Sequence, residues 1–83
     1  MPQMGIKINQ DYKASFGAKL RRIRESKGIS QETLAAIAGL DRTYVSSCER
    51  GKRNIGLENI HRLANALEIT VESLFKDDSE DGK

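Results

Sequence analysis

The apolar positions of this 83-residue chain recur every three or four residues, in short blocks that end at glycines. In the first block, apolar side chains step by four, four and three residues, at Tyr12, Phe16, Leu20 and Ile23. This spacing places them on one face of a helix. Gly28 follows the block, and glycine readily accepts the positive φ that ends many helices. A first helix is therefore predicted from residue 12 to shortly before Gly28.

The second block predicts a short helix over residues 31–38. Ser30 precedes it and is a good N-cap, because its hydroxyl can accept a hydrogen bond from an exposed amide of the next turn. The side chains expected to face inward are Leu34, Ala35 and Ala38. Gly39 ends the helix, at a position where a left-handed conformation is cheap only for glycine.

A third helix is predicted to start at Asp41 and to end at Gly51. Asp41 is the expected N-cap, and its negative charge also suits the positive end of the helix dipole. Val45 and Cys48 lie three residues apart and should share the inner face.

The fourth block is the clearest, with a broad apolar stripe at Leu57, Ile60, Leu63, Ala64 and Leu67. Thr70 can cap a last helix that carries Val71, Leu74 and Phe75. No stretch alternates with a period of two, so strands are not expected. The pattern predicts an all-α fold of five short helices over residues 12–75, with a flexible N-terminal arm at 1–11 and a disordered acidic tail at 76–83.

The composition excludes several classes of protein. With one cysteine, no intramolecular disulfide is possible, and no Cys/His set exists for a zinc site. No apolar run approaches the roughly 20 residues that span a membrane, and the first ten residues lack the apolar core of a secretory signal. We expect a cytoplasmic protein with no metal, cofactor or small-molecule ligand.

Charge is distributed unevenly along the chain. Residues 1–53 hold 11 Lys and Arg against 5 Asp and Glu, whereas residues 54–83 hold 3 against 7. The first part therefore carries a charge of +6 and the second −4. Such polarity suggests one face for a polyanion, although a mixed solvated surface is the simpler alternative.

An enzyme is not expected. The lone histidine, His61, follows Ile60 on the fourth helix and is predicted to lie at the surface. Cys48 falls at a core spacing with no histidine nearby in sequence, so a small buried hydrophobe is the preferred interpretation. A redox-sensing thiol is the alternative.

Two short helices joined by a glycine-containing turn form a helix-turn-helix unit. Ala35 lies where two steeply crossing helices would touch, and only a small side chain permits that approach. The buried side of the pair would comprise Leu34, Ala38, Leu40, Val45 and Cys48.

At this level the sequence resembles a known family. The stretch "GAKLRRIRESKGISQETLAAIAGLDRTYVSSCERGKRNIGLENIHRLANALEI" is similar to the Xre/Cro-type helix-turn-helix domain, with "SQETLA", a turn glycine and "ERG" as its marks. Within that family, "LDRTYVSSCERGKRN" is most similar to the controller proteins of restriction–modification systems. The resemblance covers about residues 16–75. It implies a compact five-helix, lambda-repressor-like domain that dimerises on a DNA operator of approximate two-fold symmetry.

In such a domain the third helix lies in the major groove of double-stranded DNA. Arg42 is the best candidate to read a base, because its guanidinium can bond both acceptors of a guanine. The predicted base-facing set is Arg42, Thr43, Ser46 and Ser47.

Contacts to the sugar-phosphate backbone are predicted for a second set, namely Gln31, Tyr44, Arg50, Lys52, Arg53 and Asn54. For Tyr44 two interpretations stay open: its hydroxyl reaches a phosphate, or the side chain is simply half-buried. The resemblance also implies that Arg24 and Glu49 form a partly buried ion pair, which ties the first helix to the third.

The dimer is inferred because a single helix-turn-helix makes few contacts with DNA. The apolar residues expected to face a partner subunit are Leu57, Ile60, Val71, Leu74 and Phe75; alternatively, all of them serve the core. The sequence therefore predicts a dimeric, autoregulatory restriction–modification controller. An antitoxin-type or phage-type repressor that also binds a protein is the alternative, and contact with RNA polymerase stays open.

Overall fold

The computed structural model describes residues 12–76 and shows four α-helices and one short 3-10 helix. The α-helices are α1 (Tyr12–Ser26), α2 (Gln31–Ala38), α3 (Arg42–Glu49) and α4 (Leu57–Leu67), and the 3-10 helix is η1 (Val71–Leu74). Between residues 12 and 76 there is no strand, so the all-α class is confirmed. The predicted arm at residues 1–11 and residues 77–83 of the predicted tail lie outside the described residues.

The prediction of a fifth α-helix is wrong, because the segment after α4 forms one turn of 3-10 helix. The Thr70 hydroxyl accepts a hydrogen bond from the Ser73 amide, as expected of an N-cap, and Phe75 already turns back to bond the Glu72 carbonyl. Of the four helical residues only Leu74 is buried. A segment this short keeps the tighter i to i+3 bonding, which is typical of isolated helical turns.

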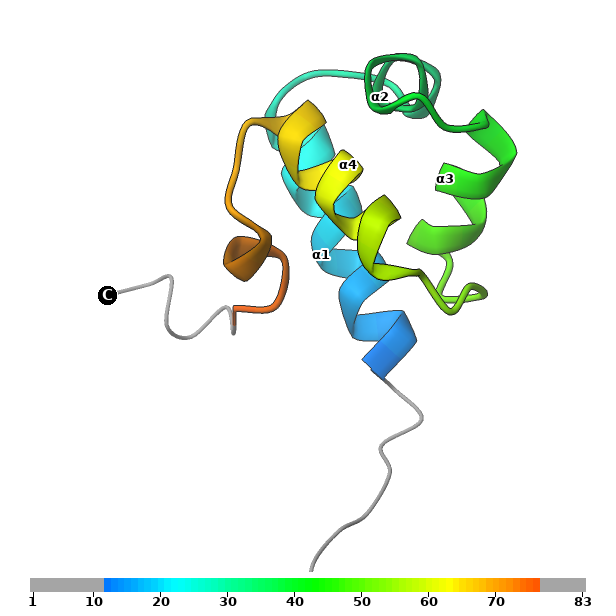
Figure 1. Ribbon diagram of the computed structural model, residues 1–83, viewed down its shortest axis with the longest axis vertical. Coiled ribbons are helices and arrows are strands. Elements are labelled where there is room, and N and C mark those ends of the chain that lie inside the picture. The colour runs from blue at the N-terminus through cyan, green and yellow to red at the C-terminus, as the bar shows by residue number, and fades with distance from the viewer. Residues whose placement is uncertain (1–11, 77–83) are drawn as a thin grey trace, which may run out of the picture.

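α1 and α4 overlap at the centre of the view in Figure 1. α3 packs against α1 and α2, α2 also packs against α4, and η1 packs against α4 and α1. In this view α3 and η1 lie on opposite sides of α4 (Figure 1). This arrangement leaves the outer face of α3 open to solvent.

The core is formed by the apolar faces that the helical periodicity predicts. Its fully buried side chains are Leu20, Leu34, Val45, Cys48, Leu63, Leu67 and Leu74. Two positions of the predicted stripes differ, because Tyr12 and Leu57 stand at the first turns of α1 and α4 and project past the core. Their exposed fractions are 50% and 71%.

The turns follow the predicted backbone chemistry, with one exception. Ser30 caps α2 by accepting a hydrogen bond from the Thr33 amide, and Gly39 and Gly51 both have positive φ, at 74° and 73°. Asp41 stands at the predicted N-cap position of α3 but makes no side-chain capping bond. The contribution of Asp41 is then limited to its charge near the positive end of the helix.

Gly17 is the point of closest approach between α1 and α3. A Cβ atom added there would lie 2.3 Å from the Cys48 carbonyl oxygen and 2.6 Å from that of Glu49. Only glycine allows the α1 backbone to reach the last turn of α3 at this distance. The position of α3 relative to α1 therefore depends on Gly17.

Candidate nucleic-acid interface

α2, the turn at Gly39 and α3 form the helix-turn-helix, and α3 presents two different faces. Its inner face carries Val45 and Cys48, which are 0% and 1% exposed. Its first turn carries Arg42 and Thr43, which are both exposed. Within residues 12–76, the Arg42 side chain has no ion pair and no side-chain hydrogen bond. Its guanidinium is thus available to a ligand at the start of α3, which is where a recognition helix meets base edges.

Ser46 and Ser47 lie further along α3 and are half-buried. Arg50, just beyond the helix, donates a hydrogen bond from Nη1 to the Ser46 hydroxyl at 2.5 Å. The structure thus brings together one predicted base-facing residue and one predicted backbone-contacting residue. The Ser46 hydroxyl keeps its own hydrogen for donation to an outside acceptor.

Gln31 is placed differently from its predicted use. Its side-chain Nε2 donates to Glu49 Oε1 at 2.9 Å, so part of the amide is directed at α3 rather than at solvent. The residue is half-buried, and the amide oxygen and second N–H are still able to serve a ligand. Gln31 thus joins the start of α2 to the end of α3.

Arg24 and Glu49 form a buried ion pair that joins α1 to α3. Arg24 donates from Nε and Nη2 to the two carboxylate oxygens at 2.6 and 3.0 Å, and the side chains are only 10% and 2% exposed. Arg24 Nη1 also donates to the Ile29 carbonyl at 2.9 Å. The hydrogen bond from Glu49 raises the pKa of Arg24 above its ordinary value, despite the opposing effect of burial. This pair fixes the C-terminal end of α3.

The loop after α3 carries three exposed polar residues, Lys52, Arg53 and Asn54. The Arg53 guanidinium carbon lies 4.9 Å from the centre of the Tyr44 ring, within the range of a cation–π contact. A cationic side chain in the loop is therefore held over α3. The backbone amide of Lys52 donates a hydrogen bond to the Ser47 carbonyl at 3.0 Å, which joins the loop to α3.

Tyr44 is half-buried, and its hydroxyl already has a partner in α4. Asn59 Nδ2 donates to that hydroxyl at 3.0 Å. This agrees with one of the two interpretations left open by the sequence, while the hydroxyl hydrogen is still a possible donor to a phosphate.

Cys48 is buried and does not have the properties of a reactive thiol. Desolvation raises the pKa of the Cys48 thiol to about 11, although the nearby Tyr44 hydroxyl and the positive charge of Arg53 act in the opposite direction. At neutral pH the side chain is then a protonated thiol, which is a poor nucleophile. His61 is exposed, as predicted.

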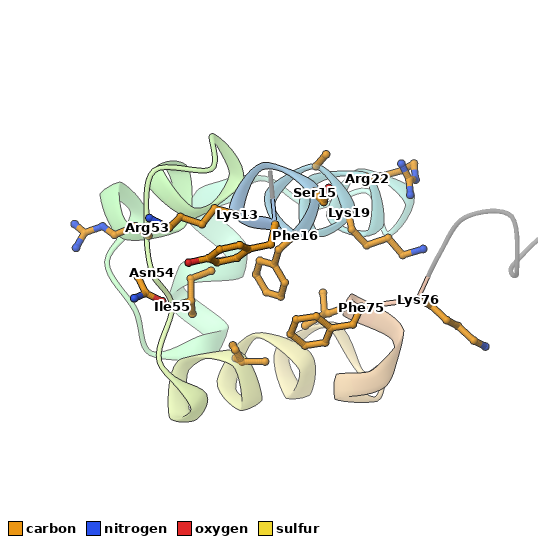
Figure 2. Close-up of a pocket in the computed structure, with 14 residues that line it drawn as sticks. Lys13, Ser15, Phe16, Lys19, Arg22, Arg53, Asn54, Ile55, Phe75 and Lys76 are labelled. Carbon is orange, nitrogen blue, oxygen red and sulfur yellow. The ribbon is translucent and has the colours of Figure 1, made fainter. Parts of the chain in front are cut away.

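A groove with an apolar floor runs between α1 on one side and α4 and η1 on the other (Figure 2). Phe16 and Phe75 point toward one another across it, with ring centres 5.3 Å apart. Arg53 and Asn54 stand at one end of the groove, and Lys76 stands at the other (Figure 2). The groove thus extends from the side of α3 to η1.

The residues predicted to face a partner subunit divide into three groups. Leu57 and Phe75 are 71% and 61% exposed, and Ile60 and Val71 are half-buried against the core. Leu74 is only 1% exposed, so its assignment to an intersubunit surface is wrong. The cause is the 3-10 turn of η1, which directs Leu74 inward and leaves Phe75 outside.

Sequence reasoning did not identify Gly17 and Asn59 as important. A glycine inside a helical pattern is a recognisable signal, because it costs about 1 kcal/mol relative to alanine unless a close approach requires it. Asn59 gave no such signal, since a polar residue on the fourth helix is ordinary until its partner on another helix is known.

Within residues 12–76 no group of three or more His, Cys, Asp or Glu side chains is placed to hold a metal ion. None of the described helices has the length and apolar character needed to cross a membrane.

Comparison with known proteins identifies the family. Residues 20–74 match the family model HTH_3, described as helix-turn-helix. Control protein C.MunI of Mycoplasma is 48% identical over 81% of this chain and 92% of its own length. Control protein C.BamHI of Bacillus amyloliquefaciens is 48% identical over 72% of this chain and 75% of its own. The crystal structure of the restriction-modification controller protein C.AhdI from Aeromonas hydrophila is 55% identical, with a TM-score of 0.74 over 75% of this chain and 94% of its own. The chain therefore belongs to the helix-turn-helix family and is a transcription regulator of the restriction–modification controller type.

Proposed function

We propose that this protein binds a pseudo-palindromic DNA operator as a homodimer and regulates the expression of its own restriction–modification operon. The observation that carries the proposal is the exposed first turn of α3, where Arg42 and Thr43 project from a helix anchored by Val45 and Cys48. A helix that is fixed on one face and polar on the other can enter the major groove without distortion.

The polar residues of this region divide by position into two roles. Arg42 and Thr43 lie at the start of α3 and would reach base edges, with Ser46 and Ser47 behind them as short side chains that allow close approach. The residues that would contact phosphates lie at the edges of that surface, namely Gln31, Tyr44, Arg50, Lys52, Arg53 and Asn54. Phosphate contacts supply affinity and salt dependence, whereas base contacts supply sequence choice.

The dimer is proposed because apolar side chains are left uncovered at the start of α4 and after η1. Leu57 and Phe75 are mostly exposed, and Phe75 lies at the apolar groove between α1 and η1. A second copy that covers these side chains would place two α3 helices on the same side of a DNA duplex. The two helices would then read half-sites about one helical turn apart.

Autoregulation is proposed from the relatives. C.MunI and C.BamHI are control proteins, and C.AhdI is a restriction-modification controller. A regulator of this type that binds the promoter of its own operon can adjust the expression of the nuclease over time. A reporter driven by that promoter should respond to the added protein, and an unchanged reporter would contradict autoregulation.

Selection of bound sequences from a random duplex pool tests the DNA-binding proposal. The expected result is one sequence in two inverted copies, with half-site centres about 10 base pairs apart. Recovery of unrelated sequences, or of a single unrepeated half-site, would refute the proposal. Sedimentation of the free protein at high micromolar concentration should give a dimer, and a monomer there would refute the dimer.

Two arginine substitutions test the division of roles. Arg42→Ala should remove discrimination at one base position, costing about 1–3 kcal/mol there. Arg53→Ala should weaken binding to all sequences to a similar extent and reduce the salt slope by about one. If the two variants behave alike in titrations against matched and mismatched duplexes, the division of roles is wrong.

A further inference from the structure

α4 has one specific polar link to α3, and that link leads to the proposed DNA-contacting loop. α3 packs mainly against α1 and α2, so it takes little of its position from α4. The Asn59 side chain nevertheless reaches from α4 to the Tyr44 hydroxyl on α3, with a donor–acceptor distance of 3.0 Å. Both side chains are half-buried, which makes this bond less screened than a surface contact.

The orientation of the Tyr44 ring in turn affects Arg53, which stacks on it. The Arg53 guanidinium carbon lies 4.9 Å from the centre of the Tyr44 ring. The ring can support the guanidinium only while its plane keeps one orientation. A tyrosine ring that is anchored at its hydroxyl cannot swing about its side-chain bonds, so the anchor also fixes the surface beneath Arg53.

We propose that Asn59 is a positioning residue for DNA binding, which holds the Tyr44 ring so that Arg53 is presented to the phosphate backbone in one conformation. This inference rests on the proposed function. Arg53 is exposed, and an exposed arginine that samples many rotamers loses side-chain entropy when it binds. Stacking on a fixed ring removes part of that loss before DNA arrives.

The geometry distinguishes this role from simple packing. Asn59 is one of several half-buried side chains, but its amide donates to the one aromatic hydroxyl that lies between α4 and α3. Deleting the amide keeps the packing around the Tyr44 ring and removes only the hydrogen bond to its hydroxyl. The expected loss is therefore local to Tyr44 and Arg53, rather than spread through the core.

The first test uses the free protein. In the unmutated protein the side-chain NMR resonances of Arg53 should show the ring-current shift of a group stacked on an aromatic face. Asn59→Ala should move them toward the positions of an unstacked arginine. Tyr44→Phe, which keeps the ring and removes the hydroxyl, should do the same, and the double variant should show no further change. Asn65→Ala, on an exposed face of the same helix, is the matched control and should leave the resonances unmoved.

The second test measures binding to a duplex of unrelated sequence. Asn59→Ala should weaken binding about two- to fivefold, the range that a cation–π contact at an exposed site contributes. The salt slope should stay the same, because the number of phosphate contacts is unchanged, whereas Arg53→Ala should reduce that slope. In an Arg53→Ala background, Asn59→Ala should have no further effect on affinity.

Unmoved Arg53 resonances in Asn59→Ala, or an equal loss of affinity in the Arg53→Ala background, would overturn the positioning role. The resonance experiment needs no DNA, so its failure would leave the proposed function standing. Absence of DNA binding by the unmutated protein would instead overturn the proposed function, and this inference with it.

Discussion

Replacing Glu49 with alanine is expected to destabilise the fold severely, because it strands the buried guanidinium of Arg24. The carboxylate accepts two hydrogen bonds from Arg24, at 2.6 and 3.0 Å, and a third from Gln31 at 2.9 Å. With Arg24 only 10% exposed, water cannot replace these bonds without opening the contact between α1 and α3. After the substitution, only the Ile29 carbonyl and the more distant carboxylate of Glu25, at 3.9 Å, would still lie close to the charge.

The magnitude follows from the burial of the pair. Breaking a buried ion pair from one side costs about 3–5 kcal/mol. A domain of this size has a total stability of about 4–12 kcal/mol, at ~0.05–0.15 kcal/mol per residue. At about 4–8 °C per kcal/mol, the melting temperature should fall by at least about 12 °C. In a less stable background the variant would be largely unfolded at room temperature.

Thermal and urea unfolding followed by circular dichroism measure this effect. Glu58→Ala is the matched control, because it removes a carboxylate that is 80% exposed and lies 3.2 Å from Arg62 on the same helix. Its cost should not exceed about 0.5 kcal/mol. Glu49→Gln, which keeps the shape and part of the hydrogen bonding, provides a folded variant if the alanine variant is too unstable to study.

An apolar replacement of both partners, Arg24→Met with Glu49→Leu, should be more stable than Glu49→Ala alone, because no charge is then stranded. If Glu49→Ala melts at the temperature of Glu58→Ala, the reasoning from burial fails. The same conclusion follows if the double replacement is less stable than the single one.

Three further predictions concern other contacts of α3. Gly17→Ala should destabilise the protein by about 1–3 kcal/mol in urea unfolding, because its Cβ would lie 2.3 Å from the Cys48 carbonyl oxygen. Helix propensity alone would stabilise this variant by about 1 kcal/mol. A measured stabilisation would therefore contradict the close approach of α1 and α3 at Gly17. Cys48 should react with a thiol reagent at neutral pH much more slowly in the native than in the denatured protein, and equal rates would contradict its burial. Because the pKa of the native thiol is raised to about 11, against roughly 8.5 in an unfolded chain, its contribution to stability is complete below pH 8.5 and is lost as the pH rises toward 11. Lys52→Ala should reduce the salt slope of DNA binding by about one. Lys27→Ala, between α1 and α2, is the control and should leave the slope unchanged. If the two variants have equal slopes, Lys52 does not belong to the phosphate-contacting set.

Apolar periodicity and glycine chemistry were sufficient to predict the four α-helices and most of the core. Gly39 and Gly51 have the positive φ expected of them, and Leu34, Val45 and Leu63 are fully buried. The fifth helix could not be predicted correctly, because a four-residue segment has the same pattern whether it forms an α or a 3-10 turn. Which of the two forms depends on packing against α4 and α1, which the sequence pattern does not specify.

The outward residues of α3 could be predicted from helical spacing, but their partners could not. Thr43 lies opposite Val45 and Cys48 by helical geometry, and Arg42, at the first position of α3, lies beside that inner face and is exposed. The bond from Gln31 to Glu49 and the bond from Asn59 to Tyr44 join residues 18 and 15 positions apart. Such contacts depend on crossing angles between helices, which the sequence pattern does not specify.

These long-range contacts explain how an eight-residue helix can keep a fixed position at the surface of the domain. A helix this short is unstable in isolation, so its stability must come from its neighbours. α1 holds α3 through the close approach at Gly17 and through Arg24, α2 adds Gln31, and α4 adds Asn59. The contacts of Gly17, Arg24 and Gln31 all lie at the last turn of α3. They leave the first turn, with Arg42 and Thr43, unobstructed. Because none of these contacts uses the side chains of Arg42 and Thr43, the proposed function predicts that substitutions at these two positions change the preferred DNA sequence while leaving the fold intact.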